Sequence, residues 1–256
     1  MSSTLRSIWM WLATITSILL WLPMLSIIRL FDRTPPYFVA GRMFRRLGKL
    51  MVTLNPAWRV HIAGKQYVDT HQAYVVVSNH QSLVDIPLLS CLPWEMKWIA
   101  KAELFRIPIV GWMMRMAGDI PLDRQQRSGA QALLRAKRYL QQNCSVMIFP
   151  EGTRSQDGSV QPFTDGAFHL AIKARVPVLP IAIEGSHSCL EKGSWKFGEP
   201  RDIFLTILPP ISTAGLTSRD TGALKERVHR EVVAQVEKLR GQIPREAAPG
   251  PCGIAP

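Results

Sequence analysis

A long uncharged segment near the start of the chain constrains its fold more than any other feature. Residues 7–28 contain no Asp, Glu, Lys or Arg and are dense in Ile, Leu, Trp and Met. At about 1.5 Å per residue in a helix, this run is long enough to cross a hydrocarbon core of about 30 Å. A secretory signal peptide would have a shorter apolar region and a small-residue cleavage site, and neither is evident. The sequence therefore predicts a membrane-anchoring helix, and Pro23 keeps a re-entrant or interfacial helix open beside a full span.

An amphipathic segment follows at residues 39–54. Its apolar side chains fall on one stripe at 100° per residue, and its basic side chains fall on the flank and the opposite side. The apolar set is Val39, Met43, Leu47, Leu50 and Leu54, and the basic set is Arg42, Arg45, Arg46 and Lys49. This pattern is typical of a helix that lies on an anionic leaflet. A core-packing helix with a solvated basic face fits the pattern equally well.

The charges around the apolar segment predict its orientation. Only Arg6 and the amino terminus precede it, whereas Arg29, Arg33 and the basic set follow it. Cytoplasmic flanks carry the excess of Lys and Arg, so the rest of the chain is expected in the cytoplasm. We therefore expect the protein at the cytoplasmic face of the cell inner membrane, anchored by residues 7–28.

The overall charge points to an anionic partner. The net charge is +12 and the pI is about 10.0. Because the sequence shows no DNA- or RNA-binding module, we expect the lipids of an anionic membrane leaflet, and no nucleic acid, as that partner. The four cysteines are scattered without a CxxC pair, which argues against a zinc site or a disulfide framework.

From residue 58 onward, short β-branched runs alternate with helical patterns. The sequence predicts strands at residues 58–62, 73–77, 96–100, 146–149, 178–183 and 203–208, and helices at residues 84–92, 109–116, 129–142, 165–173 and 223–239. This order predicts an α/β domain with a mixed, mostly parallel central sheet flanked by helices. We assign residues 1–55 to membrane-anchoring helices, 56–243 to the α/β domain, and 244–256 to a tail whose Pro, Gly and Ala content predicts disorder.

Three polar loops are expected at the carboxyl ends of strands, at residues 78–85, 121–124 and 150–155. Ligands of open α/β sheets bind at this edge, so the loops can share one site. In the first loop, His80 and Asp85 would point about 140° apart on a regular helix, but a turn before the helix lets them meet. The carboxylate would then fix the imidazole tautomer and leave the other ring nitrogen as a base. A loop histidine whose hydrogen bonds are satisfied and a helix-capping aspartate are the alternative.

The third loop places Glu151 and Arg154 in a turn opened by Gly152. The planar fork of an arginine suits bidentate contact with a phosphate, and glycine permits close approach of the backbone to an anion. Lys101 and Arg124 are further candidates for the phosphate. For each cation taken singly, a solvated surface charge is the alternative, and Glu151 with Arg154 fits an exposed ion pair.

Together these segments resemble the 1-acyl-sn-glycerol-3-phosphate acyltransferase family. The resemblance covers residues 58–210 and rests on four ordered blocks: residues 79–85 (Asn-His-Gln-Ser-Leu-Val-Asp), 118–124 (Gly-Asp-Ile-Pro-Leu-Asp-Arg), 149–155 (Phe-Pro-Glu-Gly-Thr-Arg-Ser) and 176–183 (Val-Pro-Val-Leu-Pro-Ile-Ala-Ile). The first and third blocks are specific, whereas the fourth is little more than a strand.

The resemblance implies transfer of an acyl group from acyl-CoA or acyl-carrier protein to the sn-2 hydroxyl of lysophosphatidic acid, giving phosphatidic acid. It implies His80 as the base and Asp85 as its partner, without a metal, a cofactor or a covalent acyl-enzyme. The residues expected to bind the substrate are Asn79, Lys101, Arg124, Glu151, Gly152, Thr153 and Arg154. The chain also lacks the G-x-S-x-G and S-x-x-K motifs of serine nucleophiles, which favours direct transfer.

Two other functions remain open on the sequence. The first changes only the acceptor, to another lysophospholipid, a lyso-aminolipid or glycerol 3-phosphate. The second is a non-catalytic, membrane-tethered lipid-binding protein of the same fold, against which the presence of His80, Asp85, Glu151 and Arg154 argues.

Overall fold

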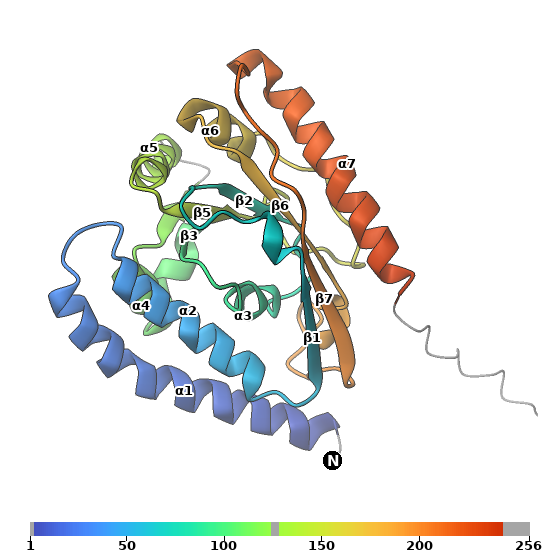
Figure 1. The fold of residues 1–256 in the computed structure, drawn as a ribbon. Helices are drawn as coiled ribbons and strands as arrows, with labels where there is room; N and C mark the ends of the chain where they lie inside the picture. The colour runs from blue at the N-terminus through green and yellow to red at the C-terminus, as the bar shows by residue number, and fades with distance from the viewer. Residues whose placement is uncertain (1–2, 124–127, 243–256) are drawn as a thin grey trace, which may run out of the picture.

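The computed structural model describes residues 3–123 and 128–242 of the 256-residue chain (Figure 1). In chain order the elements are α1 Ser3–Phe31, α2 Phe38–Thr53, β1 Trp58–Ala63, η1 Lys65–Tyr67, β2 Val75–Ser78, α3 Asp85–Leu89, β3 Met96–Lys101, η2 Ala102–Arg106, α4 Val110–Ala117, β4 Ile120–Leu122, α5 Ser128–Gln141, β5 Ser145–Ile148, α6 Gly166–Ala174, β6 Val178–Glu184, η3 His187–Cys189, β7 Arg201–Ile207, η4 Ser218–Asp220 and α7 Thr221–Arg240. All the predicted strands and helices after residue 56 are present, with ends that differ by at most three residues.

The strands form one sheet in the order β1-β7-β6-β2-β5-β3-β4. Every neighbouring pair is parallel except β6 and β7, which are antiparallel. The predicted mixed, mostly parallel sheet is therefore confirmed. One expectation was wrong: residues 121 and 122 are not in a loop. They belong to β4 because they pair with Ala100 and Lys101 of β3.

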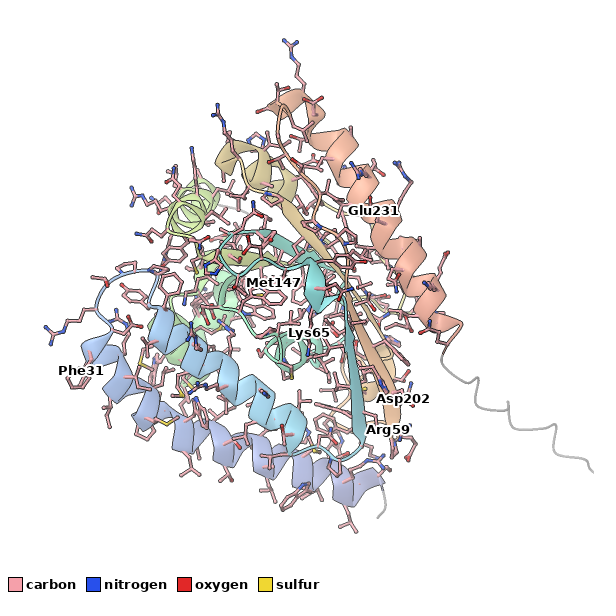
Figure 2. All side chains as sticks on the ribbon, in the orientation of Figure 1. Phe31, Arg59, Lys65, Met147, Asp202 and Glu231 are labelled. Carbon is pink, nitrogen blue, oxygen red and sulfur yellow. The ribbon has the colours of Figure 1, made fainter. Side chains whose placement is uncertain are left out.

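The two faces of the sheet bury separate apolar clusters, as alternation along a strand requires. Val75 and Val77 of β2 belong to the cluster covered by α5, α6 and α7. Val76, with Met147 of β5, belongs to the cluster that includes the side chains of α3 and the start of α1. Figure 2 shows Met147 near the centre of the sheet. β2 is buried along its whole length, which suits a central parallel strand.

Helix α1 lies along α2 and does not project from the domain (Figure 1). Near its start, Arg6 pairs with Glu199 at 3.0 Å and Trp11 donates to the Trp195 carbonyl at 2.8 Å. Toward its end, Trp21 donates to the Met43 carbonyl of α2 at 2.9 Å. Ser26 Oγ also donates to Met116 Sδ of α4 at 3.7 Å, so both halves of α1 rest on the same body.

Helix α2 packs against α1, α3 and α4. This packing corrects the expectation that Arg45 belongs to a solvated or lipid-facing basic stripe. Arg45 is buried and pairs with Asp119, which is also buried, because α4 packs on α2 and the Trp98 ring of β3 lies next to the guanidinium. Arg42, Arg46 and Lys49 are exposed as expected.

The predicted tail at 244–256 lies outside the described residues, as do residues 1, 2, 124–127 and 243. The division at residue 56 stays a prediction.

Candidate active site

Two of the predicted loops meet at the carboxyl edge of the sheet. The loop after β2 carries His80, and the loop after β5 carries Glu151 and Arg154. Because β2 and β5 are parallel neighbours, with Val77 opposite Ile148, both loops leave the sheet at the same edge. The chain thus brings together residues that lie about 70 positions apart, such as His80 and Glu151.

His80 and Asp85 form the pair that the sequence predicted. His80 Nδ1 lies 2.7 Å from Asp85 Oδ2. The same oxygen accepts the backbone N–H of Gln81 at 2.7 Å and of Ser82 at 2.9 Å, so Asp85 closes the turn that lets it reach the ring. An oxygen that accepts two N–H groups is best matched by a third donor, which assigns the proton to Nδ1. Nε2 is left as the basic nitrogen, without a hydrogen-bond partner among the described residues.

The loop after β5 holds the backbone of His80 on both sides. The His80 N–H donates to Glu151 Oε1 at 2.9 Å, and its carbonyl accepts from the Ser155 N–H at 2.8 Å. Gly152 between them has a φ of 74°, in the left-handed region that glycine adopts without steric cost. The third block of the sequence therefore fixes the position of the first.

Glu151 is buried beside the negative charge of Asp85. Burial raises the pKa of its carboxyl to about 8, Asp85 adds to the rise, and hydrogen bonds from the backbone of His80 and Gln161 oppose it. The protonated form of the carboxyl group is therefore favoured at neutral pH. Its Oε2 atom is buried without a partner among the described residues.

The remaining predicted substrate-binding residues occupy different positions. Thr153 is exposed, and Arg154 is half-buried in the same loop, without an ion pair to a described residue. Lys101 is exposed at the end of β3, opposite Leu122 of β4. Arg124 lies outside the described residues, two positions after β4.

Asn79 serves the framework in this structure. It is fully buried, and its amide donates to the Ile183 carbonyl and accepts the Ile183 N–H, both at 2.8 Å. These bonds tie the start of the first loop to β6. The substrate contact expected of Asn79 stays a prediction.

The structure adds two side chains that the sequence reasoning gave no role. Gln81 is buried, and its amide donates to the Gly158 carbonyl at 2.9 Å and to Glu184 at 3.0 Å. These bonds hold the loop after β2 against the end of β6. The ring of Phe149 stacks on the ring of His80 with centroids 3.9 Å apart. The only signal for Phe149 was its place before Pro150 in the third block.

This arrangement suits general-base chemistry on a hydroxyl group. One ring nitrogen is held by a buried carboxylate and the other is available to take a proton. Among the described residues there is no group of His, Cys, Asp and Glu side chains able to hold a metal ion. The expectation that no cofactor is needed stays a prediction.

Comparison with known proteins agrees with this site. A family model described as Acyltransferase matches residues 59–184, which include both loops. The 1-acyl-sn-glycerol-3-phosphate acyltransferase alpha of Mus musculus is 38% identical over 178 residues, 68% of this chain and 62% of that protein. The Homo sapiens protein of the same name is 37% identical over 186 residues, 71% of this chain and 65% of that protein.

A solved structure agrees as well. The 1-acyl-sn-glycerophosphate (LPA) acyltransferase PlsC from Thermotoga maritima is similar with a TM-score of 0.79 at 30% identity, covering 93% of this chain and 96% of that chain. The match of the family model to the sheet and both loops identifies an acyltransferase domain. Within that class, the chain belongs to the 1-acyl-sn-glycerol-3-phosphate acyltransferase family. It spans 62% and 65% of the two mammalian relatives, which is less than two thirds of their length.

Proposed function

We propose that the protein transfers a fatty acyl group from a thioester donor to the sn-2 hydroxyl of 1-acyl-sn-glycerol 3-phosphate, giving phosphatidic acid. The observation that carries this proposal is the 2.7 Å contact between His80 Nδ1 and Asp85, because it leaves Nε2 as a base at the carboxyl edge of the sheet. The names of the relatives support the acceptor.

The proposed reaction proceeds by direct attack. His80 Nε2 takes the proton of the sn-2 hydroxyl as its oxygen bonds to the thioester carbonyl carbon. The tetrahedral intermediate then collapses, the C–S bond breaks, and the imidazolium returns the proton to the leaving thiolate. Asp85 compensates the charge of the imidazolium while it exists. General-base assistance contributes about 10²–10⁴-fold, so positioning of the two substrates must supply much of the remaining rate.

The proposed donor is acyl-CoA or acyl-carrier protein, with no cofactor. Arg154 is the proposed main ligand of the acceptor's phosphate, since it is half-buried in the loop that holds His80 and makes no ion pair with a described residue. Lys101 and Arg124 are proposed as further phosphate ligands.

We propose that α1 holds the protein on the anionic, cytoplasmic face of the inner membrane. α1 is the one helix in the described part of the chain with the length and apolar character to cross a bilayer. However, Arg6 near its start contacts Glu199 and Ser26 toward its end contacts Met116 of α4, which favours a helix lying in the membrane surface. Its outward side chains are apolar and exposed: Leu5, Ile8, Trp9, Leu12, Ile15, Leu19, Leu20, Ile27, Leu30 and Phe31. Figure 2 shows Phe31 at the outer end of this helix.

An acceptor panel tests the proposed function. The detergent-purified protein is supplied with acyl-CoA or acyl-carrier protein and with lysophosphatidic acid, other lysophospholipids, a lyso-aminolipid or glycerol 3-phosphate. We expect phosphatidic acid, identified by mass, to form fastest. Faster acylation of another acceptor would reassign the substrate. Lipid binding without release of thiol from either donor would contradict an enzymatic role.

A further inference from the structure

The bond to Asp85 does not by itself fix the direction of the catalytic nitrogen. The hydrogen bond at Nδ1 limits rotation of the imidazole about its Cβ–Cγ bond only within the broad range of angles that a hydrogen bond tolerates. Proton transfer needs Nε2 within about 2.6–3.2 Å of the attacking oxygen, so the plane of the ring matters as much as the tautomer. A second contact on the ring would narrow this range.

Phe149 provides a surface that fits this need. Its ring lies nearly parallel to that of His80, with an angle of 12° between the planes and 3.9 Å between the centroids. At this separation the rings are in van der Waals contact, so the imidazole cannot tilt toward Phe149. We infer that Phe149 is a positioning residue that sets the plane of the His80 ring, an inference that rests on the proposed general-base function.

The position of Phe149 is in turn held by a row of side chains across the sheet. β2, β5 and β3 are adjacent, and the rings of His80, Phe149 and Trp98 come from these strands or from directly after them. Trp98 is buried and meets Phe149 at 5.8 Å with a tilt of 51°. Beyond it, the Arg45 guanidinium lies 5.2 Å from the Trp98 ring.

Buried polar contacts fix the far end of this row. Arg45 pairs with Asp119, and Asp119 also accepts the backbone N–H of Trp98 at 3.0 Å. Helix α2 therefore supports the catalytic ring through Arg45, Trp98 and Phe149. A fixed row of this kind allows little rotation of the last ring in it.

The stack also suits the charge that the reaction creates. When Nε2 takes the proton, the imidazole becomes a cation lying over the negative face of the Phe149 ring. Stacking therefore favours the transition state as well as the orientation of the base. An aliphatic side chain of similar size would keep the packing but lose both the flat surface and this attraction.

Replacement of Phe149 tests the inference. Phe149→Leu should lower kcat about 10- to 100-fold, because small misplacement of a reacting group costs up to about 100-fold. KM for lysophosphatidic acid should change by less than about twofold, because Phe149 is not assigned to substrate binding. Phe149→Tyr keeps the aromatic face and should restore most of kcat. If the Leu variant does not fold, Phe149→Met makes the same comparison with a more adaptable side chain.

The chain supplies a matched control. Phe204 stacks on His61 with centroids 4.9 Å apart and an angle of 18°, on β7 and β1 at the far end of the sheet. Phe204→Leu removes the same kind of contact and should leave kcat unchanged.

Three outcomes would overturn the inference: a kcat for Phe149→Leu within about threefold of wild type, a rise in KM at unchanged kcat, or an equal loss in the Tyr variant. Failure of the proposed function gives a different result, since the wild-type protein would then transfer no acyl group at all.

Discussion

At the scale of the residue, Glu151 combines a framework role with an unusual protonation state. Its Oε1 accepts the His80 N–H, and burial raises its pKa to about 8. The carboxyl of an unfolded chain has the ordinary value of 4.5. Retention of the proton therefore contributes stability that is fully present below pH 4.5 and is lost as the pH rises toward 8.

Glu151→Gln should remove this pH dependence while keeping an oxygen for the His80 N–H. We expect the thermal midpoint of the variant to rise relative to wild type as the pH increases from about 5 to about 9. Glu237→Gln, on the exposed part of α7, is the control and should show no such trend. A difference in thermal midpoint between variant and wild type that stays constant across this pH range would contradict the raised pKa of Glu151.

Arg154 is expected to recognise phosphate through its shape as well as its charge. Arg154→Lys keeps the charge but loses the planar fork of donors. The transition-state stabilisation measured by kcat/KM with lysophosphatidic acid should therefore fall by about 1.5–3 kcal/mol. The loss should be much smaller with monoacylglycerol, which has no phosphate. Arg230→Lys, on an exposed position of α7, should change neither rate. Equal losses with both acceptors would show that Arg154 supports the donor site or the framework and does not bind the acceptor's phosphate.

The sequence predicted the His80–Asp85 contact because a polar turn after a buried strand lets two side chains five positions apart meet. It did not predict that Asp85 also accepts two backbone N–H groups, because that depends on the path of the turn. The stacking of Phe149 on His80 could not be predicted from the sequence for a similar reason. Sequence spacing does not specify which ring at a strand end will cover the imidazole.

At the scale of the element, α2 shows the limit of helical periodicity. The pattern predicted the helix within one residue at each end. It could not show that Arg45 points into the protein, because the carboxylate that pairs with it comes from Asp119, 74 positions later. The order of the strands in the sheet was equally out of reach, since it depends on long-range pairing.

The buried pair of Arg45 and Asp119 should be important for stability. Arg45→Met leaves the Asp119 charge buried without an ion-pair partner and should lower the free energy of unfolding by about 3–5 kcal/mol. Adding Asp119→Asn should recover part of the loss, because the amide oxygen can still accept the Trp98 N–H. The partly exposed pair of Arg59 and Asp202 is the control and should contribute about 0–1 kcal/mol. If denaturant titrations give a similarly small loss in the free energy of unfolding for Arg45→Met, the Arg45–Asp119 pair is not important for stability.

At the scale of the whole molecule, the outward face of α1 sets how the protein meets lipid. Burial of an exposed leucine or isoleucine contributes about 1.5–3 kcal/mol. Replacing Leu12, Ile15 and Leu19 together with Ser should therefore make the protein extractable from membranes by high salt, whereas wild type should require detergent. Leu134→Ser, at an exposed position of α5, should not change extraction. Quantitative salt extraction of the wild-type protein would contradict anchoring by α1.

The central claim is that His80, held by Asp85, acts as the base for acyl transfer to lysophosphatidic acid. The most direct measurement is the rate of phosphatidic acid formation by the wild-type protein and His80→Ala, each purified in detergent and checked for folding by thermal unfolding. We expect the wild type to form phosphatidic acid and His80→Ala to lose at least about 100-fold, the lower end for general-base assistance. A folded His80→Ala variant that keeps more than about a tenth of the rate, a loss below about 1.4 kcal/mol, would contradict the account.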